Sequence, residues 1–313
     1  MNFSNSAFIF PGQGSQSPKM LSDYFDHQKI FCKTFDEARS ILDIDFRELI
    51  EISSADDLAS TEITQPLMLI ANIAIWRSLN TNASSVFAMA GHSLGEFAAL
   101  VASDSISFSD ALELVTIRAN LMQLAVPEEN GAIAAIMGLN LESIKVICNL
   151  ISEDPDELVE TANLNSPVQT VISGTKSGVN KAIELCLKDG AKRAIPLAMS
   201  VPSHCGLMKS AAEKFALKLD HFLIKKPSTK IFQNYSAIST DSPDVIKENL
   251  VKQIYNPVRW VETIQNINAE GVANYYECGP SKVLSGLIKR ILDSPIVTNL
   301  NDHENLKNLT KKV

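Results

Sequence analysis

The stretch that decides the fold reads VFAMAGHSLGEFAALVA at residues 86–102. Its first five residues form a short apolar run typical of a buried strand, and its last seven carry helix formers on an apolar stripe. Between them, we expect Gly91 and Gly95 to permit a sharp turn that exposes the hydroxyl of Ser93. At a helix N-terminus that serine would lie beside free backbone amides, which can hold the oxyanion of an acyl-transfer intermediate.

The rest of the chain alternates strand-like and helical segments. Residues 7–10 form an apolar run that ends in PGQGSQ, and residues 64–79 carry apolar side chains at helical spacing. Strands that alternate with helices favour a parallel sheet with helices on its faces. The sequence therefore predicts an α/β fold.

The order of segments changes between about residues 131 and 197. The pattern there predicts a strand, a helix, two strands, a helix and a strand, at residues 132–139, 141–151, 160–164, 170–173, 177–188 and 192–197. That order is the split βαβ pattern of ferredoxin-like domains. We therefore expect a discontinuous catalytic domain, residues 1–128 and 199–313, with a small ferredoxin-like subdomain inserted at residues 129–198.

Composition excludes several classes of protein. The 313 residues are 45% hydrophobic and 20% charged, as in ordinary globular proteins, and a net charge of −8 disfavours nucleic acid or an anionic membrane as a partner. The N-terminus lacks the features of a signal peptide, and no later run is apolar for long enough to span a bilayer. The five cysteines form no CxxC pair, and no acidic or histidine cluster has metal-ligand spacing. We therefore expect a cytoplasmic protein with reduced thiols and no metal.

A nucleophilic serine needs a base, and His204 is the most credible of the five histidines. It lies in the proline-bearing run VPSHC, and loops on a rigid scaffold often carry catalytic side chains. His92 adjoins the serine, but neighbours at a tight turn point in different directions, so we expect it to pack behind the turn. His27, His221 and His303 lie in polar or helical surroundings typical of surface or capping roles. From the residues alone, a structural role for His204 is as well supported as a catalytic one.

Four separated motifs carry a resemblance to a known family. They read FIFPGQGSQ at residues 8–16, GHSLGE at 91–96, VPSHC at 201–205 and QIYNPVRW at 253–260. In this order they resemble the malonyl-CoA:acyl carrier protein transacylases of bacterial fatty acid synthesis. The resemblance extends from residue 8 to about residue 300. It implies an α/β-hydrolase-like core with an inserted ferredoxin-like subdomain, as the segment order also predicts.

The resemblance implies a catalytic dyad and a third residue that orients its histidine. Ser93 corresponds to the nucleophile and His204 to the general base. No aspartate stands in a matching position. In the family a backbone carbonyl, here that of Gln253, orients the histidine, so the third member of the site is neutral.

Further positions match residues that bind the substrate in the family. The backbone amides of Gln13 and Leu94 correspond to the oxyanion hole, which gives the PGQGSQ loop a reason to be rich in glycine. Arg118 matches the arginine that binds the free carboxylate of malonyl, and a guanidinium offers that carboxylate two parallel donors. Asn163 and Asn234 match residues that line the cleft.

By the same resemblance, the chain is expected to be a monomer that transfers malonyl from malonyl-CoA to the phosphopantetheine thiol of acyl carrier protein. The expected mechanism is ping-pong, passes through a malonyl-serine ester and uses no cofactor. Malonyl loading for a polyketide pathway is an alternative to fatty acid synthesis. A serine thioesterase would use the same elbow but normally needs an acid between serine and histidine, where Asp189 is a candidate. A carrier-binding protein without activity is a further alternative, which intact Ser93, His204 and Arg118 oppose.

Overall fold

The larger part of the molecule is built on a parallel sheet. The computed structural model describes residues 3–154, 156–199 and 201–311, and within them five parallel strands lie in the order β7-β2-β1-β8-β9. Their bounds are Phe3–Phe10 (β1), Val86–Gly91 (β2), Lys230–Phe232 (β7), Asn274–Glu277 (β8) and Ile296–Asn299 (β9). The predicted α/β fold is confirmed. Strand β1 begins at Phe3, four residues earlier than the apolar run predicts, because Phe3 pairs with Val86.

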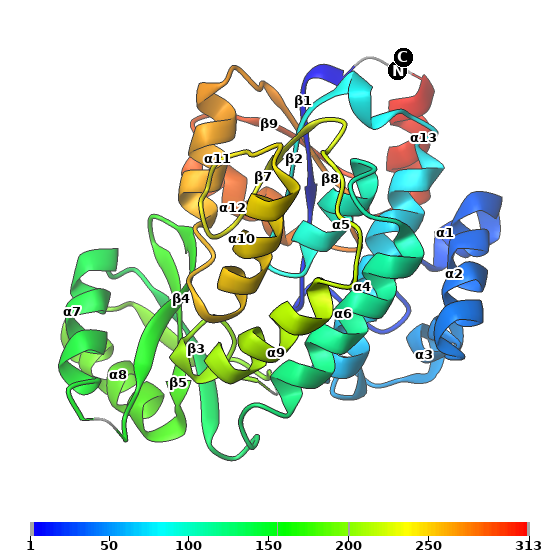
Figure 1. The fold of residues 1–313 in the computed structure, drawn as a ribbon. Helices are drawn as coiled ribbons and strands as arrows, with labels where there is room; N and C mark the ends of the chain where they lie inside the picture. The colour runs from blue at the N-terminus through cyan, green and yellow to red at the C-terminus, as the bar shows by residue number, and fades with distance from the viewer. Residues whose placement is uncertain (1–2, 155, 200, 312–313) are drawn as a thin grey trace.

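Helices cover both faces of this sheet (Figure 1). Their bounds are Ser22–His27 (α1), Lys29–Leu42 (α2), Phe46–Ile52 (α3), Thr61–Ser78 (α4), Gly95–Ala102 (α5), Phe108–Gln123 (α6), Lys209–Leu219 (α9), Pro243–Tyr255 (α10), Trp260–Ala269 (α11), Val283–Ile291 (α12) and His303–Lys311 (α13). Short 3-10 turns occupy Asp57–Ala59, Ala83–Ser85 and Gly206–Met208. No helix formed by the described residues is both long and apolar enough to cross a bilayer.

Strand β1 shows how the sheet is buried on two sides. Phe8 and Phe10 belong to one apolar cluster, which includes α4, α5 and α6, whereas Ala7 and Ile9 belong to another, which includes α11 and α12. Because successive strand side chains point to opposite faces, a strand buried on both faces reads as a continuous apolar run.

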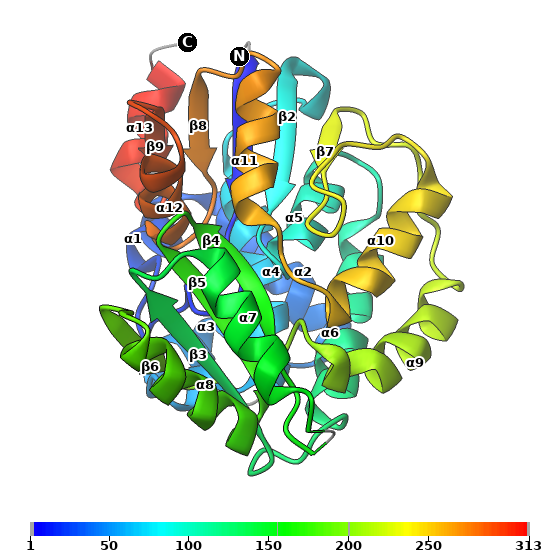
Figure 2. The same ribbon diagram turned by 90° about the vertical axis from the view of Figure 1, so that its left-hand side faces the viewer.

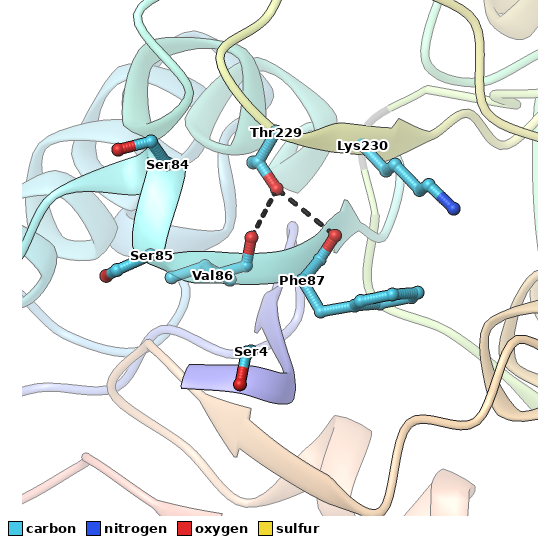
Figure 3. Close-up of a pocket in the computed structure, with 7 residues that line it drawn as sticks. All are labelled: Ser4, Ser84, Ser85, Val86, Phe87, Thr229 and Lys230. Atoms are coloured by element: carbon cyan, nitrogen blue, oxygen red, sulfur yellow. Dashed lines mark hydrogen bonds between the residues drawn. The ribbon is translucent and has the colours of Figure 1, made fainter. Parts of the chain in front are cut away.

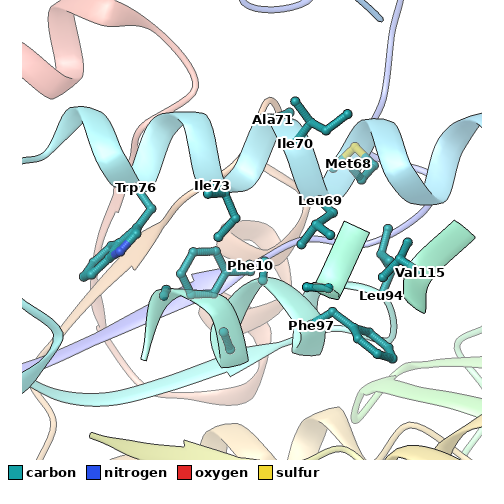
Figure 4. Packing of buried hydrophobic residues seen from close by; sticks show 14 of the residues in the cluster. Phe10, Met68, Leu69, Ile70, Ala71, Ile73, Trp76, Leu94, Phe97 and Val115 are labelled. Atoms are coloured by element: carbon teal, nitrogen blue, oxygen red, sulfur yellow. The ribbon is translucent and has the colours of Figure 1, made fainter. Parts of the chain in front are cut away.

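Helix α4 is central to the larger cluster. Almost all of its side chains are buried, including residues on every side of the helix. Figure 4 shows α4 passing over Phe10 of β1, with Leu94 and Phe97 beside it. The elbow and the end of β1 therefore pack against a helix that is buried on every side.

A second, antiparallel sheet forms a small lobe at the carboxyl ends of the parallel strands (Figures 1 and 2). Its strands lie in the order β4-β5-β3-β6, and two helices pack against it. Their bounds are Gly131–Met137 (β3), Leu141–Ile151 (α7), Val159–Ser166 (β4), Gln169–Thr175 (β5), Lys176–Lys188 (α8) and Arg193–Pro196 (β6). The predicted strand-helix-strand-strand-helix-strand order is confirmed. The lobe has its own apolar cluster, and the predicted boundaries near residues 129 and 198 remain predictions.

Register brings two loops together at the carboxyl ends of β1 and β2. Phe10 is the partner of Gly91 in the parallel pair, and the backbone amide of His92 donates to the Phe10 carbonyl at 2.9 Å. The chain leaves β1 through the PGQGSQ loop and leaves β2 through the serine pentapeptide. These two segments, about 80 residues apart in the sequence, therefore lie side by side.

Candidate active site

Ser93 stands at the tip of a strand-turn-helix elbow between β2 and α5. Its φ is +51°, in the left-handed region that residues with a side chain rarely adopt. Gly91 and Gly95 permit the turn, as expected, but not through positive φ, which neither of them has. They are required by close approach instead: a Cβ on Gly91 would lie 1.8 Å from the carbonyl carbon of Gly95, and one on Gly95 would lie 1.9 Å from the Phe10 oxygen.

Ser93, His204 and Gln253 form a continuous hydrogen-bonded line. The Ser93 Oγ lies 2.7 Å from His204 Nε2, and His204 Nδ1 lies 2.7 Å from the backbone oxygen of Gln253. A carbonyl oxygen can only accept, so Nδ1 carries the proton and Nε2 of the neutral ring accepts from the serine hydroxyl. No carboxylate takes this place, and Asp189 lies at the end of α8 in the small lobe.

His204 is held as a neutral imidazole. It is 2% exposed and, like Ser93, has a positive φ, of +63°. Burial and then the neighbouring charge of Arg118 lower the pKa of His204 to about 3, although the Gln253 carbonyl acts in the opposite direction. The ring is therefore ready to take a proton from Ser93 at neutral pH.

Arg118 reaches the nucleophile from helix α6. It is 1% exposed, and it donates to the side-chain oxygens of Gln65 at 2.5 Å and of Gln253 at 3.0 Å, while Nη2 lies 3.4 Å from Ser93 Oγ. Burial lowers the pKa of Arg118 to about 10, so it stays protonated at neutral pH. Within the described ranges its Nε has no hydrogen-bond partner and no carboxylate lies within ion-pair distance. A buried guanidinium of this kind is suited to an anionic ligand.

The PGQGSQ loop packs directly on the elbow. A Cβ on Gly12 would lie 2.4 Å from the His92 oxygen and 3.5 Å from the Leu94 nitrogen. The side chain of Gln13 is held away from the elbow, since it accepts from the Thr61 hydroxyl at 2.8 Å and donates to the Ala59 carbonyl. The backbone amides of Gln13 and Leu94 donate to no acceptor in the part of the chain that the structure describes. Both residues line the same cleft as Ser93, so two backbone amides without an acceptor belong to it.

A cleft of about 420 Å³ opens at the serine, between the elbow and the small lobe. Asn163 of β4 lines it, as predicted, together with the PGQGSQ loop and residues of β5 and α12. The prediction that Asn234 lines the cleft is wrong: Asn234 is fully buried behind the elbow. Its side chain accepts from the Ser93 amide at 2.6 Å and donates to the Gly91 carbonyl at 2.6 Å, so it braces the turn.

The remaining histidines do not reach the serine hydroxyl. His92 borders the cleft, donates from Nε2 to Asn165 Oδ1 at 2.8 Å, and meets the Trp260 ring edge-on. His27 and His303 stack on each other between α1 and α13. His204 is therefore the base candidate that the fold brings to Ser93.

Comparison with known proteins agrees with this geometry. Residues 7–310 match the acyl transferase domain family. This chain belongs to that family. The acyl transferase is 44% identical to the malonyl CoA-acyl carrier protein transacylase of Escherichia coli strain K12, over 95% of this chain and 96% of that protein. It is also 44% identical to the Bacillus subtilis protein of the same name, over 92% of this chain and 90% of that one.

Solved structures give the same result for the acyl transferase. The malonyl CoA-acyl carrier protein transacylase of Coxiella burnetii superposes with a TM-score of 0.94 at 40% identity, over 100% of this chain and 98% of that one. A type II polyketide acyl carrier protein has been solved in complex with its malonyl-transacylase. That structure matches with a TM-score of 0.95 at 41% identity, over 99% of this chain and 100% of the other.

Two buried residues of the acyl transferase site have contacts that the sequence did not predict. Gln65 lies in α4 and bonds Arg118, and Glu96 lies in the first turn of α5 and is completely buried. Each is a polar residue within an apolar helical stretch. A polar or charged side chain in such a position needs a partner, and this is the signal that would have singled out both residues.

Proposed function

We propose that the acyl transferase moves a malonyl group from malonyl-CoA to the phosphopantetheine thiol of acyl carrier protein, by a ping-pong mechanism through a malonyl ester of Ser93, in fatty acid synthesis. The observation that carries the proposal is Arg118, a buried cation 3.4 Å from the Ser93 hydroxyl without a carboxylate partner among the described residues. A free acyl carboxylate is the group that would complete its coordination.

In the first half-reaction, Ser93 Oγ attacks the thioester carbonyl while its proton passes to His204 Nε2. The backbone amides of Gln13 and Leu94 receive the developing oxyanion. The C–S bond then breaks, CoA leaves, and the proton on His204 passes to its sulfur. Arg118 holds the malonyl carboxylate throughout.

In the second half-reaction, the carrier's thiol gives its proton to His204 and attacks the ester. The Ser93–acyl bond breaks, and the proton returns to Ser93. One thioester replaces another, so the exchange is close to balanced and reversible. Because no electrons are transferred and every proton stays on Ser93, His204 or sulfur, the proposed reaction needs no cofactor.

The neutral third member of the site suits this chemistry. The Gln253 carbonyl fixes the tautomer of His204, but it stabilises an imidazolium less than a buried carboxylate would. A thiol is a good leaving group and needs less help from an acid. The lowered pKa of His204 keeps the ring unprotonated before the attack, and it makes the imidazolium that forms a ready proton donor to the leaving thiolate.

The proposal also covers the localisation of the protein, its oligomeric state and its carrier protein. We infer a cytoplasmic monomer, consistent with five cysteines that are all free thiols. Malonyl loading for a polyketide pathway is a second candidate, because one structural relative is a malonyl-transacylase bound to a polyketide carrier. The two candidates share all chemistry at Ser93 and differ only in the carrier protein.

Mixing the protein with malonyl-CoA, with and without carrier protein, tests the proposal. We expect a burst of about one CoA per enzyme without carrier, a malonyl adduct on the peptide that contains Ser93, and continued CoA release only when carrier is added. CoA release that continues equally without carrier would establish a hydrolase instead. Parallel assays with fatty acid and polyketide carriers distinguish the two pathways.

A further inference from the structure

Glu96 is a completely buried carboxylate directly behind the nucleophile. Its Oε1 accepts from Gln233 Nε2 at 2.9 Å, and its Oε2 accepts from the Asn234 amide at 2.8 Å and from Gln253 Nε2 at 2.9 Å. Every hydrogen bond that the described residues make to Glu96 comes from an N–H donor, so a proton on either oxygen would have no acceptor. The first turn of α5 adds the positive end of the helix dipole. Burial raises the pKa of Glu96, whereas these N–H donors and the nearby charge of Arg118 act in the opposite direction and stabilise the ionised form.

The side-chain amide of Gln253 joins this anion to Arg118. Its Nε2 donates to Glu96, and its Oε1 accepts from Arg118 Nη2 at 3.0 Å. A cation and an anion are thus connected through one amide, without touching each other. The backbone oxygen of the same Gln253 receives the His204 Nδ1 proton. Any movement of Gln253 would therefore change the positions of both His204 and Arg118.

We propose that Glu96 is the resident counter-anion of Arg118 and the positioning residue of Gln253, and that it sets how strongly the site prefers a carboxylated acyl group over an uncharged one. This inference rests on the proposed function. The malonyl carboxylate is a second anion, and Glu96 opposes its binding to Arg118. The imidazolium that forms on His204 is a second cation, and Glu96 stabilises it for every acyl group.

Glu96→Gln separates charge from shape. The carbonyl oxygen of the new side chain can keep both contacts of Oε2, to the Asn234 amide and to Gln253. Its NH₂ group faces the donor Nε2 of Gln233, so that one hydrogen bond is lost. Acetyl transfer should fall about tenfold, because the imidazolium loses its counter-charge, a change equivalent to about 1.4 kcal/mol. Malonyl transfer should change by less than about threefold, because weaker repulsion of the carboxylate offsets that loss. The ratio of malonyl to acetyl kcat/KM therefore rises.

The decisive test is the double variant with Arg118→Ala. Alone, Arg118→Ala leaves Glu96 as an uncompensated buried anion, which repels malonyl further. Adding Glu96→Gln should raise the ratio of malonyl to acetyl transfer of Arg118→Ala about tenfold, because the imidazolium loss affects both acyl groups equally, and should move its urea midpoint back toward that of the unaltered protein. The double variant contains neither charge, so it carries the test even if Glu96→Gln alone unfolds.

Asn249→Ala is the matched control. Asn249 donates to Gln233 Oε1 at 2.8 Å, so its loss disturbs the same buried network without changing a charge. We expect lower stability, an unchanged ratio of malonyl to acetyl transfer and no rescue of Arg118→Ala. If Glu96→Gln behaves in the same way, Glu96 is a structural residue only and the proposal is overturned. Absence of malonyl transfer by the unaltered protein would instead refute the proposed function, and this inference with it.

Discussion

Strand β2 connects two pockets of similar size and different chemistry. At its amino end, Val86 and Phe87 border a pocket of about 330 Å³ (Figure 3), and its carboxyl end leads into the cleft of about 420 Å³ at Ser93. In the first pocket the Thr229 hydroxyl is bonded to the Val86 and Phe87 carbonyls at 2.6 and 3.2 Å, and Lys230 is paired with Glu270. In the cleft, no carboxylate of the described residues lies within ion-pair distance of Arg118.

The difference between the two pockets follows from the direction of the chain in the parallel sheet. At the carboxyl ends of parallel strands the chain turns into helix N-termini, where backbone amides are free and side chains from several loops converge. At the amino ends, side chains complete the hydrogen bonding of the strands. Size alone does not distinguish the two pockets. Among the described residues, the cleft is distinguished by a buried cation without a carboxylate at ion-pair distance and by two backbone amides without an acceptor.

The largest effect should come from Ser93→Ala, which removes the nucleophile from the cleft end. We expect malonyl transfer to fall by about 10⁴-fold or more, as in other serine enzymes that lose the nucleophile. Mass spectrometry of the protein after malonyl-CoA treatment should show no adduct, with an unchanged urea midpoint. A malonyl adduct that persists in this variant would place the nucleophile elsewhere.

Arg118→Ala should have the next largest effect and a selective one. Loss of a buried charged partner is worth about 2–5 kcal/mol, so we expect malonyl transfer to fall a hundredfold or more while acetyl transfer is spared or improved. Lys230→Ala, which removes a paired cation at the opposite end of the sheet, is the control and should leave both transfers unchanged. Equal losses for the two acyl groups in Arg118→Ala would contradict carboxylate recognition.

The pH dependence should reflect the burial of the cleft. A base works unprotonated, and a lowered pKa keeps His204 unprotonated as the pH falls; with its pKa at about 3, kcat/KM should stay level from pH 7 to pH 5. With a histidine of the ordinary pKa of 6.5, kcat/KM would fall about 25-fold over that interval. Rapid-mixing measurements of CoA release at pH 5, 6 and 7 test this. An acid limb centred near pH 6.5 would show that water reaches the ring.

Thr229→Val should have the smallest effect, and on stability alone. It removes the two hydrogen bonds to the β2 carbonyls at the pocket of Figure 3, which should lower the free energy of unfolding by about 1–2 kcal/mol. Malonyl transfer should stay within twofold of the unaltered protein. A urea titration and a transfer assay on the same sample make the check, and a clear loss of transfer would show that the two ends of β2 are coupled.

Much of the fold could be predicted because its signals are local. The predicted helix at residues 141–151 coincides with α7, and the order of elements in the small lobe was read from periodicity. Strand β1 was predicted too short because Ser4, Asn5 and Ser6 interrupt its apolar run, whereas a pairing with Val86 extends it. The apolar pattern of a segment does not show which distant strand pairs with it.

Only the residues of the candidate site that match a family resemblance could be predicted from the sequence. Ser93, His204 and Arg118 were identified with the help of a resemblance, and the fold brings them together. The supporting network was missed because its contacts join residues far apart in the chain, such as Glu96 with Gln253. Asn234 was misplaced for the same reason: an asparagine does not reveal from its neighbours whether it faces a cleft or braces a turn.

The left-handed backbone at Ser93 and His204 has a consequence for engineering. Such a conformation costs a residue with a side chain about 1–2 kcal/mol, and glycine would relieve it at both positions. A sequence optimised for thermal robustness alone would therefore discard both reactive side chains. Selection schemes that reward only heat resistance will drift toward an inert protein unless these two positions are fixed.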